Sequence, residues 1–173
     1  MDLTQAIQNR YSCRSYLNKA IEQEKLNLLI EAARLAPSAR NLQDWRFVIV
    51  TDSEKRAALQ NAAANQAFVG QAPVVIAACS NTQRRMVMCG QPYSSINVSI
   101  ALEHIALTAT SLGLATCWIG SFIPHKVRKI LGIPSAIEVV QLMTVGYPAD
   151  MQPAPKRLSV DDIRCYEKWD FHS

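Results

Sequence analysis

The sequence predicts one α+β domain in which helices flank a central mixed β-sheet. Four short apolar runs have the length and composition of buried strands, and segments with helical periodicity separate them. The chain has 173 residues, of which 49% are hydrophobic and 18% charged, so it has enough apolar volume for one buried core. The same composition excludes a disordered or fibrous chain.

The first forty residues alternate short helices with extended chain. A helix is expected over Leu3–Gln8 with Asp2 as its N-cap. Arg10–Tyr16 is expected to be extended, because its mixed polar and aromatic residues lack helical periodicity. Glu22–Ala36 has apolar residues at helical spacing, and we predict a helix that Pro37 ends.

The middle of the chain predicts two buried strands, Trp45–Thr51 and Pro73–Cys79. Between them, Ser53 is expected to cap an alanine-rich helix that runs to about Asn65. A long helix is then predicted over Ser95–Leu112, and Gly113 is a suitable residue to follow its end. Because this helix is apolar on two faces, we expect more than one neighbour to bury it, in the core or at a dimer interface.

The last third of the chain predicts two more strands and a tail. The strands are Ala115–Ile119 and Glu138–Val145, and a helix over Pro124–Leu131 separates them. Residues 146–173 contain three prolines and few large apolar side chains, so this tail cannot pack on itself. We expect the tail to lie across another surface, of its own subunit or of a partner. Together with the two-faced helix, it favours an intertwined homodimer.

Composition and charge exclude several classes of protein. The 18 basic and 14 acidic residues give a net charge of +4, and the basic residues are too dispersed for a typical nucleic-acid binder. No apolar run is long enough to cross a bilayer and the N-terminus lacks a signal-peptide pattern, so we expect a cytoplasmic protein. The five cysteines are odd in number and include no C-x-x-C pair, which favours neither a disulfide framework nor a metal site.

Three polar side chains near the N-terminus have the spacing of an anion site. If residues 10–16 are extended, Arg10, Ser12 and Arg14 project from the same side of the chain. Two guanidinium groups and a hydroxyl that converge can hold a phosphate dianion. The alternative is a solvated basic loop.

Three further segments could contribute to a binding site. Lys156-Arg157 is a cation pair in the tail, and residues 37–43 form a polar loop between a helix and a strand. Residues 113–120 end in Gly120, which would let a flat ring approach the backbone. Each segment has a structural alternative. The cation pair could be solvated, residues 37–43 could form only a turn, and residues 113–120 could be a strand that ends in a turn. No familiar nucleophile, zinc, P-loop or dinucleotide motif occurs, so an enzyme of this sequence would depend on a bound cofactor.

Five segments, in order along nearly the whole chain, resemble motifs of the nitroreductase family of FMN-dependent reductases. They are R-Y-S-C-R-S-Y at 10–16, A-P-S-A-R-N-L-Q-D-W-R-F at 36–47, F-V-G-Q-A-P at 68–73, G-L-A-T-C-W-I-G at 113–120, and G-Y-P at 146–148 with Lys156 and Arg157 beyond it. Each motif is weak by itself, but five in the right order are specific. The resemblance implies a three-layer fold and an intertwined homodimer that holds FMN at its interface.

The resemblance also implies which residues bind the cofactor. Arg10, Ser12, Lys156 and Arg157 would hold the FMN phosphate with Tyr11 adjoining, and Arg14 would lie nearer the pyrimidine edge of the flavin. Pro37, Ser38, Ala39 and Asn41 would reach the flavin from the other subunit, Gln66 is a further candidate, and Trp118, Ile119 and Gly120 would line one face of the ring. No residue is assigned as acid or base.

The sequence departs from the family pattern in four respects. Asp44 stands where the pattern has Pro before Trp45, and Tyr11 stands where it has a second Arg. Lys156 and Arg157 are adjacent rather than one residue apart. The chain is also short and lacks the helical excursion that covers the active site of larger members.

The resemblance implies reduction of nitroaromatics, quinones or similar acceptors by NAD(P)H, in a ping-pong cycle through FMN. A flavin-binding storage or sensor protein is the alternative from another class. A basic interaction module without a cofactor is a third. The physiological acceptor and the preference for NADH or NADPH do not follow from the sequence.

Overall fold

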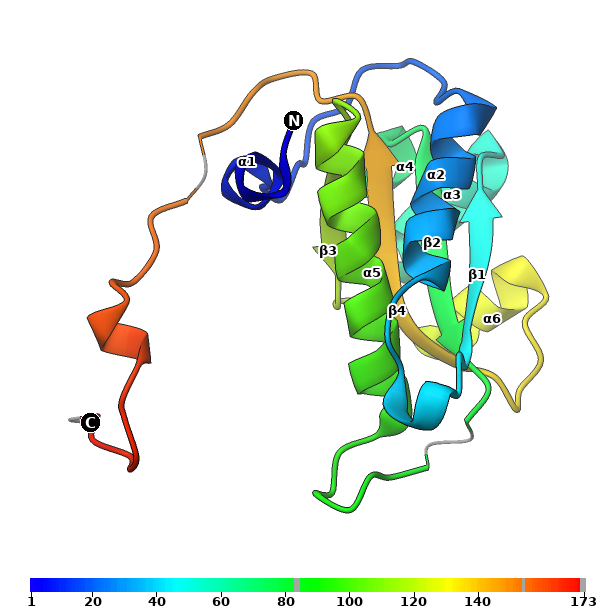
Figure 1. Cartoon of the computed structure of the whole chain (residues 1–173). Coiled ribbons are helices and arrows are strands. Elements are labelled where there is room, and N and C mark those ends of the chain that lie inside the picture. The colour runs from blue at the N-terminus through cyan, green and yellow to red at the C-terminus, as the bar shows by residue number, and fades with distance from the viewer. Residues whose placement is uncertain (83–84, 154, 172–173) are drawn as a thin grey trace.

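The computed structural model describes residues 1–82, 85–153 and 155–171, and it has three layers (Figure 1). A four-stranded sheet is the middle layer. Helices α2 (Gln23–Arg34) and α5 (Tyr93–Ser111) cover one face. The other face is covered by α3 (Ser53–Ala62), α4 (Ala67–Gln71) and α6 (Pro124–Leu131). No helix of the described residues is both long and apolar enough to cross a bilayer.

The sheet contains the four predicted strands, with small changes at their ends. They are β1 (Trp45–Val50), β2 (Val74–Ser80), β3 (Ala115–Ile119) and β4 (Glu138–Gly146), in the order β1-β2-β4-β3. Every neighbouring pair is antiparallel. The predicted mixed sheet is therefore corrected in one respect. Within the described chain, parallel pairing is limited to one bridge between Ser12 and Thr116, because the N-terminal segment runs beside β3 without continuing as a strand.

Helix α5 is fully buried along one face, whereas Ile96, Ile100 and Leu107 of its second apolar stripe are exposed or only partly buried, so this chain alone does not bury both predicted faces. Val98, Ala101, Leu102, Ile105, Ala106 and Ala109 are all fully buried. They pack with α2 and one face of the sheet in the larger of the two main cores. Each large side chain buried in this way contributes roughly 1.5–3 kcal/mol. The helix begins at Tyr93 rather than Ser95, directly after Pro92.

The helices of the opposite face differ most from the prediction. Asp52, not Ser53, caps α3 by accepting from the Lys55 N–H at 2.8 Å. The helix ends at Ala62 rather than near Asn65, because the backbone of Ala64 and Asn65 turns left-handed. Helix α4 was not predicted, because five residues are too few to show a helical period. Helix α1 (Leu3–Asn9) has the predicted cap at Asp2.

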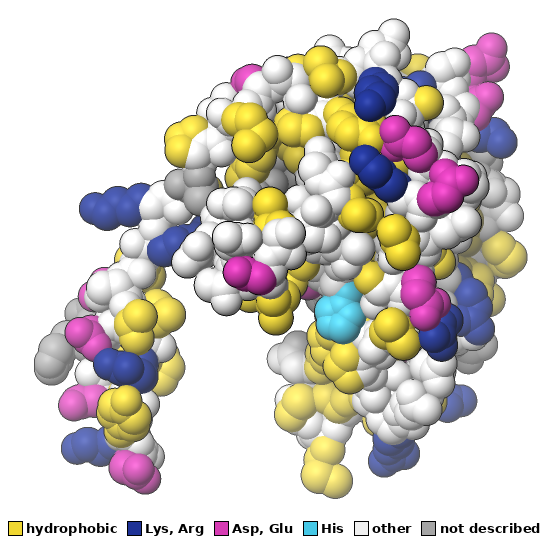
Figure 2. Space-filling view, turned by 45° about the horizontal axis from the view of Figure 1, so that its top comes forward, with side chains coloured by type: hydrophobic (Ala, Val, Ile, Leu, Met, Phe, Trp, Pro, Cys, Tyr) yellow, Lys and Arg dark blue, Asp and Glu magenta, His cyan; other side chains and the backbone are white. Residues whose placement is uncertain are grey.

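The tail leaves the body of the molecule after β4. It contains one short 3-10 turn, η2 (Asp161–Ile163), and its described residues are almost all exposed. Figure 1 shows it running away from the three layers, and Figure 2 shows hydrophobic as well as charged side chains on it. The exposed apolar residues include Met151, Leu158, Val160, Ile163, Tyr166 and Trp169. The tail therefore has apolar surface that its own chain does not cover.

Candidate functional site

Residues 10–16, which we call the cation segment, lie beside β3 and not in open solvent. The Cys13 N–H donates to the Thr116 carbonyl at 2.9 Å. Tyr11 and Cys13 are buried, whereas Ser12 and Arg14 are exposed. This alternation is the one that the spacing predicts for extended chain. Arg10, Ser12 and Arg14 therefore belong to one side of a segment that β3 holds in place.

Different elements contact the two guanidinium groups of the cation segment. Arg10 Nε lies 3.9 Å from a carboxylate oxygen of Glu103 on α5. Burial raises the pKa of Glu103, and the nearby Arg10 opposes that shift. The Arg14 guanidinium lies 5.9 Å from the centre of the Phe68 ring on α4, a cation–π distance. Arg10 and Arg14 thus flank Ser12 with separate supports.

Tyr11 faces away from the exposed side of the cation segment. Its hydroxyl donates to the backbone carbonyl of Asp150 at 2.8 Å, and burial raises the pKa of Tyr11 to about 12. The Ala149 N–H donates to the Ser15 carbonyl at 2.9 Å nearby. Tyr11 therefore fixes the start of the tail against the cation segment.

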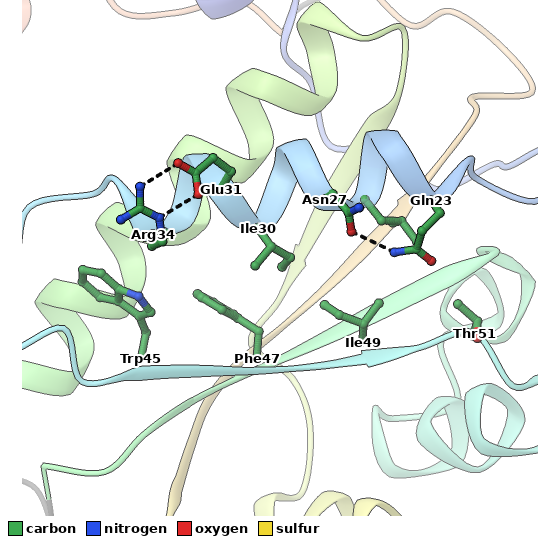
Figure 3. A pocket seen from close by; sticks show the side chains of 10 residues that line it. Gln23, Asn27, Ile30, Glu31, Arg34, Trp45, Phe47, Ile49 and Thr51 are labelled. Atoms are coloured by element: carbon green, nitrogen blue, oxygen red, sulfur yellow. Dashed lines mark hydrogen bonds and ion pairs between the residues drawn. The ribbon is translucent and has the colours of Figure 1, made fainter.

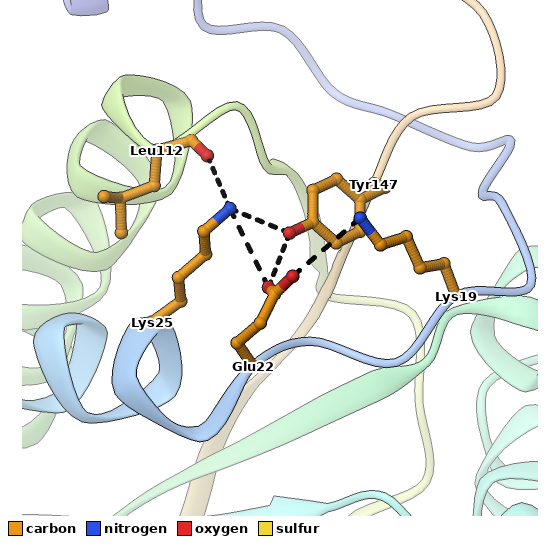
Figure 4. Close-up of polar contacts among 5 residues, drawn as sticks. All are labelled: Lys19, Glu22, Lys25, Leu112 and Tyr147. Carbon is orange, nitrogen blue, oxygen red and sulfur yellow. Dashed lines mark hydrogen bonds and ion pairs between the residues drawn. The ribbon is translucent and has the colours of Figure 1, made fainter.

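The first residues after β4 are also fixed from the side of α2 (Figure 4). Tyr147 donates its hydroxyl proton to a Glu22 carboxylate oxygen at 2.5 Å and accepts from Lys25 Nζ at 2.7 Å. Lys25 Nζ also donates to the Leu112 carbonyl at 3.3 Å, and Lys19 Nζ lies 3.9 Å from the centre of the Tyr147 ring. The hydrogen bond from Tyr147 is the main cause that lowers the pKa of Glu22. The start of the tail is therefore held in place at Tyr147.

Residues 37–43, which we call the site loop, form a 3-10 turn at the first turns of α5. The turn is η1 (Ala39–Asn41), where the sequence predicts a plain loop. The Ala39 N–H donates to Asn97 Oδ1 at 3.0 Å, and the Gln43 N–H donates to Ser38 Oγ at 3.0 Å. The site loop therefore contacts α5 at Asn97, whereas the cation segment contacts it at Glu103. Within one chain, the described contacts do not join these two groups of candidate residues.

The remaining predicted residues lie at the end of β3 and in the tail. Gln66 Nε2 donates to the Ala63 carbonyl at 2.9 Å and lies 3.4 Å from the Ser121 carbonyl, so it ties the turn after β3 to α4. Trp118 is half-buried against the α5 side, Ile119 is buried, and Gly120 is exposed. Because the Ile119 side chain lies in the core, only its backbone is available to a ligand. Lys156 and Arg157 are exposed. They belong to the tail, which runs away from the three layers in Figure 1.

Cys117 is a buried thiol beside the cation segment. Burial is the largest effect on it and raises its pKa, while Arg14 acts in the opposite direction. A buried thiol with a raised pKa remains protonated at neutral pH, so Cys117 is a poor nucleophile.

A groove of about 540 Å³ lies between α2 and β1, and the sequence motifs do not predict it (Figure 3). Its floor is made by Trp45, Phe47 and Ile49 of β1, and Ile30 and the Glu31–Arg34 ion pair lie on the α2 side. Alternate apolar residues in W-R-F-V-I are a signal that could have indicated an apolar face at this strand. None of the predicted cofactor residues lines this groove.

Comparison with known proteins identifies the family whose fold this chain has. The model of the Nitroreductase family matches residues 7–73 and 63–147. The chain belongs to the nitroreductase family. A relative named NADH dehydrogenase, from Thermus thermophilus, is 30% identical over 94% of this chain and 95% of its own length.

Solved nitroreductases have the same fold. A nitroreductase family protein from Clostridium novyi superposes with a TM-score of 0.82 and 32% identity, over 87% of each chain. The NADPH:FMN oxidoreductase from Vibrio harveyi, complexed with NAD⁺, gives a TM-score of 0.91 and 25% identity, over 99% of this chain and 79% of that one. The predicted nitroreductase-like three-layer fold is thus confirmed.

Proposed function

We propose that this nitroreductase binds FMN and uses NAD(P)H to reduce small-molecule acceptors. The observation that carries the proposal is the row of Arg10, Ser12 and Arg14 on one side of a segment held by β3, in which Ser12 and Arg14 are exposed and Arg10 is partly buried. The fixed guanidinium group of Arg10 and the Ser12 hydroxyl suit a terminal phosphate dianion, and Arg14 adds a second cation toward the flavin ring. The named activity of the Vibrio harveyi oxidoreductase supports the choice of FMN.

The chemistry of the donor set fits this cofactor. Arg10 and Arg14 supply planar pairs of N–H donors, and the Ser12 hydroxyl adds a neutral donor between them. Cations favour the bound anion by charge, and donors fixed before binding lose little entropy when the ligand arrives. Lys156 and Arg157 would add charge only if the tail folds toward the cation segment of one subunit. Tyr11 contributes by fixing the tail rather than by binding phosphate.

Bound FMN supplies two-electron chemistry, in which hydride arrives from NAD(P)H and electrons leave to an acceptor such as a nitroaromatic or a quinone. The chain's own residues bind and orient. Arg14 contributes positive charge near the pyrimidine edge of the ring, and the exposed backbone at Gly120 leaves room for a flat ring. We assign no acid or base, and the acceptor enters and leaves by the same opening in a ping-pong cycle.

We further propose that each site is shared by two copies of the chain. The site loop of one protomer would reach the flavin bound by the cation segment of its partner, through Pro37, Ser38, Ala39 and Asn41. Two features support this arrangement. The described contacts of one chain leave the site loop and the cation segment apart, and the tail has exposed apolar side chains that suit a partner's surface. In this proposal, residues 146–173 cross to the partner subunit.

The cofactor is tested by the absorbance spectrum of the purified full chain. A flavin spectrum is expected, and denaturing release followed by chromatography should identify FMN rather than FAD. Release of FAD, or a colourless protein that fails to take up added FMN, would overturn the proposal.

The reductase activity is tested separately, by steady-state oxidation of NADPH and of NADH with a quinone or a nitroaromatic acceptor. The expected result is turnover that depends on bound FMN. A yellow protein that fails to oxidise either nucleotide would instead be a flavin-storage or sensor protein.

A further inference from the structure

Asp44 is a buried carboxylate directly before β1, at a position where the sequence departs from the nitroreductase pattern. Only 2% of the residue is exposed. Ser80 Oγ donates to Asp44 Oδ2 at 2.5 Å, and Asn97 Nδ2 donates to Asp44 Oδ1 at 2.6 Å. Burial of a carboxylate is costly unless its oxygens accept hydrogen bonds, and both oxygens of Asp44 do so.

The amide of Asn97 connects Asp44 to the site loop. Asn97 is fully buried in α5, and its Oδ1 accepts from the Ala39 N–H at 3.0 Å. An ionised carboxylate can only accept hydrogen bonds. Asp44 therefore turns the Nδ2 end of the amide toward itself and leaves the Oδ1 end for Ala39. A residue without a side-chain acceptor at position 44, such as the Pro of the family pattern, would not impose this orientation.

The site loop needs such a restraint because its backbone is unfavourable. Arg40, Asn41 and Gln43 have φ angles of 53°, 54° and 48°. A residue other than glycine in this left-handed region costs of order 1 kcal/mol, and the conformation persists only where its surroundings hold it. The bond from Ala39 to Asn97 ties the loop to the rigid α5, whereas the bond from Gln43 to Ser38 lies within the loop.

We propose that Asp44 is a positioning residue that acts through Asn97 to hold the site loop in the conformation that meets FMN. The proposal rests on the proposed function for the identity of the ligand. Asp44 itself lies beneath the loop and bonds to Ser80 and Asn97. Its contribution to binding is therefore pre-organisation of the loop, which lowers the entropy lost on binding.

The same hydrogen-bond network provides a matched control. Thr82 Oγ1 lies 2.9 Å from Ser80 Oγ, so Thr82 belongs to the network but has no bond to Asn97 or to the site loop in the described structure. Thr82→Val should lower the melting temperature and leave the affinity for FMN within about twofold of the parent. A role of Asp44 in general stability alone would make Asp44→Ala behave like Thr82→Val.

A second variant removes the restraint at the loop itself. Ala39→Pro deletes the N–H that donates to Asn97. Proline suits this position because Ala39 is the first residue of the 3-10 turn and Ser38 is extended, with φ −140° and ψ 153°. If Asp44 acts through this bond, Asp44→Ala should have no further effect on FMN affinity once Ala39 is Pro.

The experiment measures the FMN dissociation constant of the full-length protein by flavin fluorescence, well below the melting temperature, for the four combinations of Asp44→Ala and Ala39→Pro. Asp44→Ala is expected to weaken binding about tenfold in the parent and less than about twofold in the Ala39→Pro background. An equal loss in both backgrounds, or no loss in the parent, overturns the proposal. If Asp44→Ala does not fold, the isosteric Asp44→Asn replaces it. The same losses of FMN affinity are expected in the parent and in the Ala39→Pro background, because an amide at position 44 no longer fixes the orientation of Asn97.

A measurement on the protein without FMN separates this proposal from the proposed function. Hydrogen exchange of the Ala39 amide, followed by NMR, should be at least about tenfold faster in the Asp44 variant than in the parent and unchanged in Thr82→Val. Unchanged exchange in the Asp44 variant overturns the positioning role, whether or not FMN binds. Faster exchange in a protein that binds no flavin would retain the positioning role and reject FMN as the ligand.

Discussion

At the residue scale, a different structural element contacts each of the three polar side chains of the cation segment. Arg10 is held near Glu103 on α5, Arg14 lies over Phe68 on α4, and Ser12 bridges to β3. Because each donor has its own support, the loss of one should leave the geometry of the others in place. Single substitutions in the cation segment are therefore informative about binding.

Substitution of Arg10 should weaken the binding of FMN. Arg10→Ala removes a charge-assisted hydrogen bond to the proposed phosphate, which is worth roughly 1.5–3 kcal/mol. The measurement is the dissociation constant of FMN by fluorescence. Arg34→Ala is the matched control, because Arg34 is an exposed arginine paired with Glu31 on α2. Equal affinities of the parent and Arg10→Ala would show that the cation segment does not bind the phosphate.

Tyr11 should make the stability of the protein depend on pH in alkaline solution. Burial raises its pKa to about 12 in the folded chain, against about 10 when unfolded. The neutral phenol is therefore favoured by folding, so its contribution is complete below about pH 10 and is lost as the pH rises from about 10 to about 12. Tyr11→Phe should show a smaller loss of stability over this range than the parent.

The pH test compares urea unfolding at about pH 9 and about pH 11.5. Tyr166→Phe is the control, because Tyr166 is exposed in the tail. If Tyr11→Phe loses as much stability as the parent between the two pH values, the phenol of Tyr11 does not keep its proton in the folded chain.

At the scale of the elements, close packing joins the end of β4 to the cation segment. A Cβ added at Gly146 would lie 2.6 Å from Pro73 Cδ and 2.7 Å from Tyr16 Cδ1. Real Cβ atoms do not approach carbon atoms so closely, so position 146 requires glycine. This contact brings the strand that leads into the tail against the segment that carries the two arginines.

Gly146→Ala should therefore destabilise the fold by about 1–3 kcal/mol, the usual cost of overpacking. Chemical denaturation measures the effect. Gly120→Ala is the control for stability, because a Cβ there would meet no atom within 4 Å. A Gly146→Ala protein as stable as Gly120→Ala would mean that Pro73 and Tyr16 move without cost.

At the scale of the whole molecule, the proposed site needs two chains. In a two-fold symmetric dimer, each of the two equivalent sites would take its arginines from one subunit and its loop from the other. At an FMN concentration at which each variant alone leaves its sites empty, two variants can then restore binding in each other. Arg10→Ala damages the cation segment, and Asn41→Leu damages the site loop.

Co-expression of Arg10→Ala and Asn41→Leu at equal levels should restore about a quarter of the sites. Random pairing makes about half of the dimers mixed. In each mixed dimer, one site carries both substitutions and the other site carries neither. FMN content and NAD(P)H oxidation measure the recovery, and differential tags verify the mixed dimers. No recovery in verified mixed dimers would place both residues in a site of one chain.

Much of the fold was predictable because local patterns determine it. The apolar run over Ala115–Ile119 matched β3 at both ends, and Asp2 capped α1 as its position predicts. Other features carry no such local signal. Asp52 and Ser53 are both good N-caps, and only the path of the chain selects Asp52. The site loop also needs the amide of Asn97, more than fifty residues away, to hold its left-handed residues.

The sequence by itself determined the strands, the long buried helix, and the row of Arg10, Ser12 and Arg14, because hydrophobic periodicity and the alternation of extended chain act over a few neighbouring residues. Only the tertiary structure decided that Asp44, Ser80 and Asn97 meet beneath the site loop, and that Glu103 and Phe68 support the two arginines. These contacts join residues far apart in the chain. Asp44, Ser80 and Asn97 bond to one another because buried polar groups need hydrogen-bond partners, and the two arginines meet Glu103 and Phe68 because packing brings α5 and α4 beside the cation segment.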